Sequence, residues 1–81
     1  MNGKYRCTLC HEIKSTNVFE EVGKIDENIS IFHIEAIAKN GDTIYNNGVV
    51  IVENGVIKYK ALSTGCIGGN VYVSIRYDKV A

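Results

Sequence analysis

The dipeptide Asn-Gly divides the middle of the chain into short runs of alternating residues. It occurs three times between residues 39 and 60, as Asn40-Gly41, Asn47-Gly48 and Asn54-Gly55, with five residues between successive pairs. Both residues of an Asn-Gly pair adopt positive φ at little cost, which suits the two-residue type I′ turn of a β-hairpin. The spacing therefore predicts a β-meander here, preceded by a strand that begins at Ile29.

Turns of this type fix the strand register, so the register can be compared with the hydrophobic pattern. The predicted pairs are Val52 with Ile57, Val50 with Tyr59, Tyr45 with Val50, Thr43 with Val52, Ala38 with Thr43 and Ala36 with Tyr45. One face of the sheet is then almost entirely apolar, and its residues are Phe32, Ile34, Ala36, Ala38, Thr43, Tyr45, Val50, Val52, Ile57 and Tyr59. Because turn chemistry and hydrophobic pattern agree, we predict that this face forms the core.

The opposite face of the predicted sheet also carries large apolar residues. Its members are Ile29, Ile31, His33, Glu35, Ile37, Ile44, Ile51, Lys58 and Lys60. Ile37, Ile44 and Ile51 would lie side by side on neighbouring strands, edged by His33, Glu35 and Lys58. Either the N-terminal segment or the last strand covers this stripe, or it binds a protein partner or a second copy of the chain, since contiguous exposed apolar patches mark interaction sites.

The segments on either side of the meander complete an all-β prediction. Residues 18–25 favour a strand that pairs with the strand beginning at Ile29, although Asn17 and Glu20 also resemble a capping box for a short helix over residues 17–23. Residues 71–77 alternate between apolar and polar and predict the last strand. We expect residues 1–81 to form one small β domain of five or six strands, as a barrel or a two-layer sandwich.

Composition and charge exclude several classes of function. The chain has 81 residues with nine basic and nine acidic side chains, so its net charge is zero. General nucleic-acid binding would need a positive field, and no apolar run is long enough to cross a membrane or to form the core of a signal peptide in residues 1–25. An odd number of cysteines, three, fits a reducing compartment, so we expect a cytoplasmic protein.

A Cys-x-x-Cys motif gives the N-terminal segment a candidate metal site. Cys7 and Cys10 are followed by His11, and two thiolates at this spacing on a tight turn can bind one zinc ion. The segment from Tyr5 to Cys10 resembles the first knuckle of the zinc-ribbon proteins. That resemblance implies a second Cys-x-x-Cys, but the chain has Cys66 followed by Ile67, Gly68 and Gly69.

A closed zinc shell would therefore combine Cys7, Cys10 and Cys66 with His11 or His33. In the alternative, Cys7 and Cys10 are unliganded thiols in a strand, and Cys66 packs separately as an apolar residue.

The glycine-rich connection before the last strand is a candidate ligand site. Its backbone N–H groups could form a nest for an anion such as the phosphate of a nucleotide, together with an arginine of the last strand. The residues of this candidate site are Gly65, Gly68, Gly69, Asn70 and Arg76. The alternative is a loop that only carries the chain from one sheet to another.

Catalysis has little support in the sequence. His33 and Glu35 lie on one side of a strand, but no activated nucleophile accompanies them, so we name no catalytic residues. The predicted function is a non-enzymatic interaction module, an inhibitor or adaptor for which a mobile-element origin would fit. The alternatives are a small-ligand or nucleotide binder and a domain stapled by structural zinc.

Overall fold

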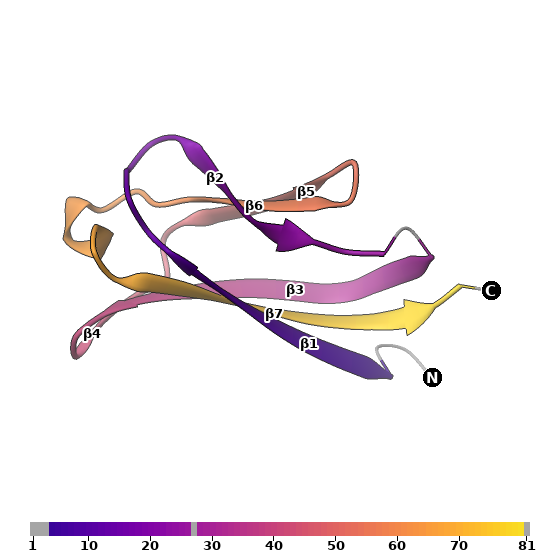
Figure 1. Cartoon of the computed structure of the whole chain (residues 1–81). Coiled ribbons are helices and arrows are strands. Elements are labelled where there is room, and N and C mark those ends of the chain that lie inside the picture. Colours follow the sequence, from indigo (N-terminus) through magenta and orange to yellow (C-terminus); the bar gives the residue numbers. More distant parts are fainter. Residues whose placement is uncertain (1–3, 27, 81) are drawn as a thin grey trace.

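The chain forms two antiparallel sheets that pack face to face (Figure 1). The structure is a computed structural model that describes residues 4–26 and 28–80. Sheet A has the strand order β1-β7-β3-β4, and sheet B has the order β2-β6-β5. The strands are β1 (Tyr5–Glu12), β2 (Phe19–Lys24), β3 (Ile29–Asn40), β4 (Thr43–Tyr45), β5 (Val49–Glu53), β6 (Val56–Lys60) and β7 (Asn70–Lys79). The predicted all-β class and two-layer sandwich are therefore confirmed.

Helical structure is confined to one turn. Over residues 4–26 and 28–80 it consists of the 3-10 turn η1 (Thr64–Cys66), which precedes β7. No helix in this part of the chain has the length and apolar character needed to cross a membrane.

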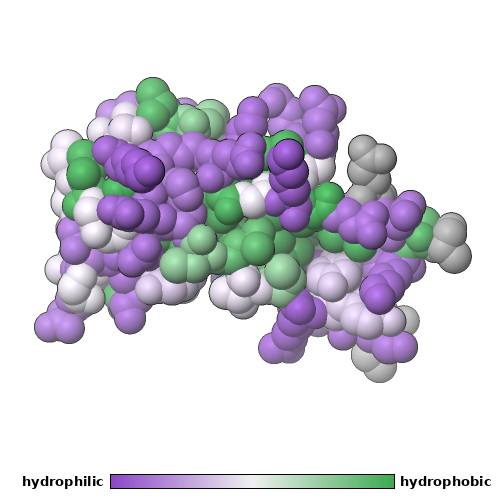
Figure 2. Space-filling model, viewed as in Figure 1, coloured by the Kyte–Doolittle hydropathy of each residue, from purple (hydrophilic) through white to green (hydrophobic). Residues whose placement is uncertain are grey.

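The core lies between the two central strands, β7 of sheet A and β6 of sheet B. On β7, Val71, Val73 and Ile75 are buried and alternate with more exposed residues, and Ile57 and Tyr59 are buried on β6. The core is completed by Ile13, Ala38, Ala61 and Cys66. Figure 2 shows hydrophobic surface along the middle of the molecule, between the two layers. The strand predicted over residues 71–77 is thus confirmed as the central strand of sheet A.

The Asn54-Gly55 turn follows the prediction. Asn54 has φ 52° and Gly55 has φ 78°, so both central residues have the positive φ of a type I′ turn. The register across the turn pairs Val52 with Ile57. Val50 pairs with Tyr59, also as predicted.

At Asn40-Gly41 the turn is shifted by one residue, so the predicted register is wrong by two residues. Asn40 pairs with Thr43, so Gly41 and Asp42 are the two loop residues, and Ala38 pairs with Tyr45 instead of Thr43. Gly41 has φ 61°. A glycine with positive φ at the first loop position is typical of a type II′ turn. In such a turn Asn40 is the last paired residue and Gly41 the first loop residue.

At Asn47-Gly48 the predicted hairpin does not form, because the chain passes here from β4 in sheet A to β5 in sheet B. The pairs Tyr45–Val50 and Thr43–Val52 are therefore wrong. Gly48 does not have positive φ, but a Cβ there would lie 2.0 Å from the hydroxyl oxygen of Tyr59. Glycine is needed at position 48 because the buried Tyr59 ring lies so close to the backbone there. The turn propensity of Asn-Gly does not predict this contact.

A β-bulge in β3 changes which residues face the core. Ile31 pairs with Tyr77 and His33 with Arg76, so Phe32 is the extra residue between them. The bulge turns Ile29 and Ile31 toward the core side and leaves Phe32 51% exposed. Phe32 was predicted on the core face, and Ile29 and Ile31 on the opposite face, so these assignments are wrong. The other predicted core residues that are exposed are Thr43 and Val52, both on short edge strands.

Residues 19–24 form a strand, as favoured, and the alternative helix over residues 17–23 is absent. The predicted partner is wrong, because β2 pairs with β6 in sheet B, whereas the strand from Ile29 belongs to sheet A. Asn17 has φ 63° just before β2 begins. It lies in the connection through which the chain leaves sheet A.

We predict that Gly48→Ala lowers the free energy of unfolding by about 1–3 kcal/mol, because the new methyl group overlaps the Tyr59 ring. Chemical denaturation measures the loss. The same substitution in a Tyr59→Leu background should cost less, since the overlapping ring atoms are gone. An equal cost in both backgrounds would show that the ring contact is not the reason.

Candidate functional site

The outer face of sheet A, which points away from sheet B, carries side chains that no described element covers. Strand pairing arranges them in rows across β1, β7 and β3. The rows are Arg6, Arg76 and His33; Thr8, Ser74 and Glu35; Cys10, Tyr72 and Ile37; and Glu12, Asn70 and Lys39. The first of these rows forms a cationic end, and apolar side chains gather toward the other end, beside the row of Glu12 and Lys39.

The apolar end consists of Ile37, Tyr72 and Ile44, which we call the apolar patch. Ile37 and Tyr72 are paired residues of β3 and β7, and Ile44 lies on β4 next to Lys39. The three side chains are 41%, 40% and 62% exposed. An apolar group of this kind on an open sheet face is typical of an interaction surface.

The predicted interaction face is only partly correct. Ile37, Ile44, His33 and Glu35 lie on the outer face of sheet A, but Ile51 pairs with Lys58 in sheet B. Lys58 forms an ion pair with Glu53 at 3.0 Å. The stripe of three isoleucines does not form, because the change of sheet between β4 and β5 separates Ile51 from the other two.

The cationic end consists of Arg6, Arg76 and His33, which we call the arginine row. The Cζ atom of Arg76 lies 5.1 Å from the centroid of the Phe32 ring, within cation–π range. His33 Nε2 lies 3.8 Å from a carboxylate oxygen of Glu35. A shallow hollow of about 400 Å³ is lined by Arg6, Arg76 and His33 together with Glu35, Thr8 and Ser74.

The residues proposed for zinc are not brought together. Cys7 and Cys10 are three residues apart in the extended strand β1, so their side chains point to opposite faces. Cys66 is buried in η1, before β7 begins, whereas Cys7 pairs with Ile75 in the middle of that strand. Residues 4–26 and 28–80 contain no group of three His, Cys, Asp or Glu side chains placed to hold a metal ion. The donor set does not fit a tetrahedral zinc shell.

The glycine-rich loop is occupied by its own hydrogen bonds. The N–H groups of Gly68 and Gly69 donate to the carbonyls of Ile13 and Cys66, both at 2.9 Å. At Gly65, a Cβ would lie 2.2 Å from the hydroxyl oxygen of Tyr45, so this glycine also permits a close approach.

Two residues of the proposed ligand site lie in β7 itself. Asn70 begins the strand, and Arg76 follows six residues later, about 20 Å along an extended chain. The structure therefore does not bring Arg76 to the glycine-rich loop.

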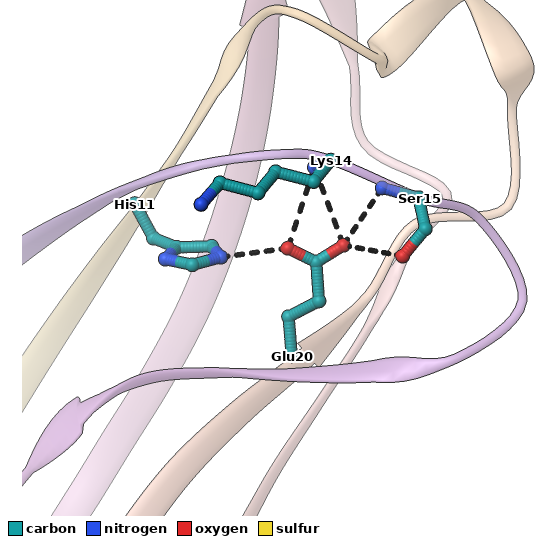
Figure 3. A network of polar contacts seen from close by, with 4 residues as sticks. All are labelled: His11, Lys14, Ser15 and Glu20. Carbon is teal, nitrogen blue, oxygen red and sulfur yellow. Dashed lines mark hydrogen bonds and ion pairs between the residues drawn. The ribbon is translucent and has the colours of Figure 1, made fainter.

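Glu20 is the centre of a polar network that the sequence did not reveal (Figure 3). One carboxylate oxygen lies 2.8 Å from His11 Nε2, and the other accepts hydrogen bonds from the N–H and the hydroxyl of Ser15, each at 2.8 Å. The N–H of Lys14 lies 3.3 Å from both oxygens. Glu20 lies on β2 of sheet B. Its hydrogen bonds therefore hold the connection that follows β1 of sheet A against the other sheet.

The hydrogen bonds also affect the ionisation of Glu20. Burial alone would raise its pKa, but the hydrogen bonds from His11, Ser15 and Lys14 outweigh burial and hold the pKa below the ordinary value of 4.5. Although His11, Ser15 and Glu20 are the residue types of a hydrolase triad, both His11 and Ser15 contact the carboxylate. A nucleophile would instead need a hydrogen bond from serine to histidine. The contacts of Glu20 are therefore not those of such a triad.

A second hollow, of about 220 Å³, lies between the sheets at the far end of β7. Its lining includes Cys7, Ile25 and Tyr77 together with Lys24 and Lys79.

Comparison with protein-family models, with curated proteins and with solved structures finds no match. The geometry of the described residues is therefore the only indication of function. The outer face of sheet A is the strongest site, and sequence reasoning missed Tyr72, Arg6 and Phe32 there. The alternation of β7 already places Tyr72 and Arg76 on one face. Knowledge that β1 pairs with β7 would also have placed Arg6 on that face.

We predict that Glu20→Gln lowers the free energy of unfolding at pH 7 by about 1–3 kcal/mol, because a charged acceptor of several hydrogen bonds is lost. The pKa of Glu20 is depressed in the folded state, so the carboxylate stabilises the fold above its unfolded pKa. This contribution is lost as the pH falls through the folded pKa. Denaturation curves should therefore show the full difference at pH 7 and a shrinking one below pH 4.5.

Glu21→Gln provides the matched control. Glu21 is the next residue of β2 and is exposed, and no hydrogen bond or ion pair of its side chain occurs within the described ranges. Its substitution should change stability little at either pH. A loss equal to that of Glu20→Gln would contradict a specific role for the network.

Proposed function

We propose that this protein is a non-enzymatic interaction module, and that a second copy of the chain covers the outer face of sheet A. The observation that carries the proposal is the apolar patch. Three large apolar side chains, Ile37, Ile44 and Tyr72, remain exposed together on a sheet face that lacks a covering layer among the described elements. A second copy would remove them from water, which stabilises an assembly in proportion to the buried area.

The residues around the apolar patch favour a symmetric pairing. A two-fold axis that crosses the strands at Ile37 would place Glu35 of one copy opposite Lys39 of the other, because both lie two residues from Ile37 on the same side of β3. The corresponding pairs are Ser74 with Asn70 around Tyr72, and Thr8 with Glu12 around Cys10. Each pair joins groups that attract or hydrogen-bond. The arginine rows would lie away from the axis, so they would not oppose each other.

Other described features support a non-catalytic and cytosolic role. His33 and Glu35 are both more than half exposed, and His11 is bonded to a carboxylate that also holds Ser15. Three free thiols on Cys7, Cys10 and Cys66 are compatible with a reducing compartment.

We predict that the parent protein sediments as a dimer. Ile37→Asp should weaken the dimer by roughly a hundredfold or more, because the two introduced carboxylates would face each other at the axis with no positive charge between them. Sedimentation equilibrium measures the dissociation constant. Ile37 is on the outer face, so the variant should still fold. Val18→Asp is the matched control, since Val18 is 51% exposed but outside sheet A, and it should leave the dimer intact. A monomeric parent would refute self-association.

A charge exchange tests the proposed axis. Glu35→Lys and Lys39→Glu should each weaken the dimer roughly five- to tenfold, because like charges would then meet twice in the symmetric interface. The double variant should recover the parent affinity. Failure of the double variant to recover would show that the two copies meet in another arrangement.

A further inference from the structure

The geometry points to the arginine row as a binding site for the phosphate group of a small organic phosphate ester. The arginine row includes no residue of the apolar patch and lies away from the proposed two-fold axis, although Thr8 and Ser74 in the adjacent row also belong to the proposed interface. The site is distinct from the glycine-rich loop, whose N–H groups at Gly68 and Gly69 are already engaged.

The first observation is the position of the two arginines. Arg6 of β1 and Arg76 of β7 are directly paired, and Arg76 is also paired with His33 of β3. Like charges directly opposite each other on neighbouring strands destabilise a sheet. An anion bound between them would remove this repulsion, and guanidinium groups bind phosphate through two parallel hydrogen bonds.

The second observation is that the acidic groups of this face do not neutralise the arginines. Glu35 lies beside His33 at 3.8 Å, and Asp78 accepts a hydrogen bond from the N–H of Lys4 at 3.0 Å. Within the described ranges, neither Arg6 nor Arg76 forms an ion pair with a carboxylate. The positive charge of both side chains is therefore available to a ligand.

The third observation concerns how Arg76 is held. The β-bulge at Phe32 places an aromatic ring 5.1 Å from its Cζ atom. Its Nε atom is buried and has no hydrogen-bond partner among the described residues. A buried donor without an acceptor is costly. The ring restrains the guanidinium group, so less conformational freedom is lost when an anion binds.

The remaining lining fits a phosphate ester. Thr8 and Ser74 form the adjacent row and can donate hydroxyl hydrogen bonds to phosphate oxygens. The hollow of about 400 Å³ falls in the size range of small-molecule sites and leaves room for an organic group beyond the phosphate. Because the hollow is shallow and Glu35 lies within it, we expect weak binding of inorganic phosphate, with a Kd on the order of 1 mM.

The experiment is a titration of the folded, isotope-labelled protein with inorganic phosphate and with phenyl phosphate, followed by NMR. Saturable shifts should appear at the Arg6 and Arg76 side-chain N–H signals and at the amides of Thr8 and Ser74. Phenyl phosphate should bind more tightly than inorganic phosphate. Arg6→Gln and Arg76→Gln should each weaken binding roughly tenfold or more, since each removes charge-assisted hydrogen bonds.

Lys60→Gln is the matched control. Lys60 is also a cation near an aromatic ring, with its Nζ 4.8 Å from the Phe19 centroid, but it lies on sheet B. This variant should bind phosphate as the parent does. The inference is overturned if the parent shows no saturable shifts, if Arg6→Gln binds normally, or if Lys60→Gln loses as much affinity. Arg6 is exposed, so its variant decides the matter even if Arg76→Gln does not fold.

Failure of this site and failure of self-association are distinguishable. The Ile37→Asp variant should bind phosphate as tightly as the parent protein does. The Arg6→Gln variant should dimerise as strongly as the parent protein does. Loss of one property without the other identifies which proposal is wrong.

Discussion

Burial of the inner faces of β7 and β6 against each other is the interaction on which the rest of the molecule depends. Val71, Val73 and Ile75 are almost entirely removed from water, as are Ile57 and Tyr59 on the facing strand. Each such side chain contributes roughly 1.5–3 kcal/mol when buried. Both strands are internal in their sheets, so β1 and β3 are placed by pairing with β7, and β2 and β5 by pairing with β6, while β4 pairs with β3. The same arrangement determines which side of sheet A remains open.

The chain must cross between the sheets repeatedly to build this core, and three of these crossings have supports that the structure shows. Glu20 ties the connection after β1 to β2. The crossing after β4 depends on the absence of a side chain at Gly48. The crossing before β7 is fixed by hydrogen bonds between Ile13 and the residues Gly68 and Gly69. These local supports give a structural reason for several glycines and polar side chains whose spacing suggested ligand or metal sites.

Three identical dipeptides illustrate how far the sequence could predict the fold. Asn54-Gly55 forms the expected turn because the residues on both sides can pair without leaving their sheet. Asn40-Gly41 forms a hairpin shifted by one residue, and Asn47-Gly48 forms none. Local chemistry permits the same turn at all three places. The outcome is decided by contacts with distant residues, such as Tyr59 against Gly48, which no local pattern contains.

The candidate site was predictable only where it depended on alternation within one strand. His33, Glu35 and Ile37 share a face of β3 as expected, and the alternation of β7 places Tyr72 and Arg76 together. The bulge at Phe32 interrupts the alternation within β3, and the chain changes sheet before Ile51. The predicted stripe of Ile37, Ile44 and Ile51 therefore does not form. Arg6 was missed because its neighbour in the sheet, Arg76, is 70 residues away in the chain.

The position of β7 between β1 and β3 also has a consequence for how the chain folds. Among the described strands β1 pairs only with β7, which lies far along the chain, so sheet A cannot be completed until β7 has been synthesised. Until then β1 and β3 expose unpaired backbone edges, which are the parts of a β protein most prone to join other chains. A topology dominated by such distant pairings folds slowly, on the order of milliseconds to seconds. The nascent chain therefore passes through a period in which shielding from its neighbours, by a chaperone or by the ribosome, determines the yield of folded protein.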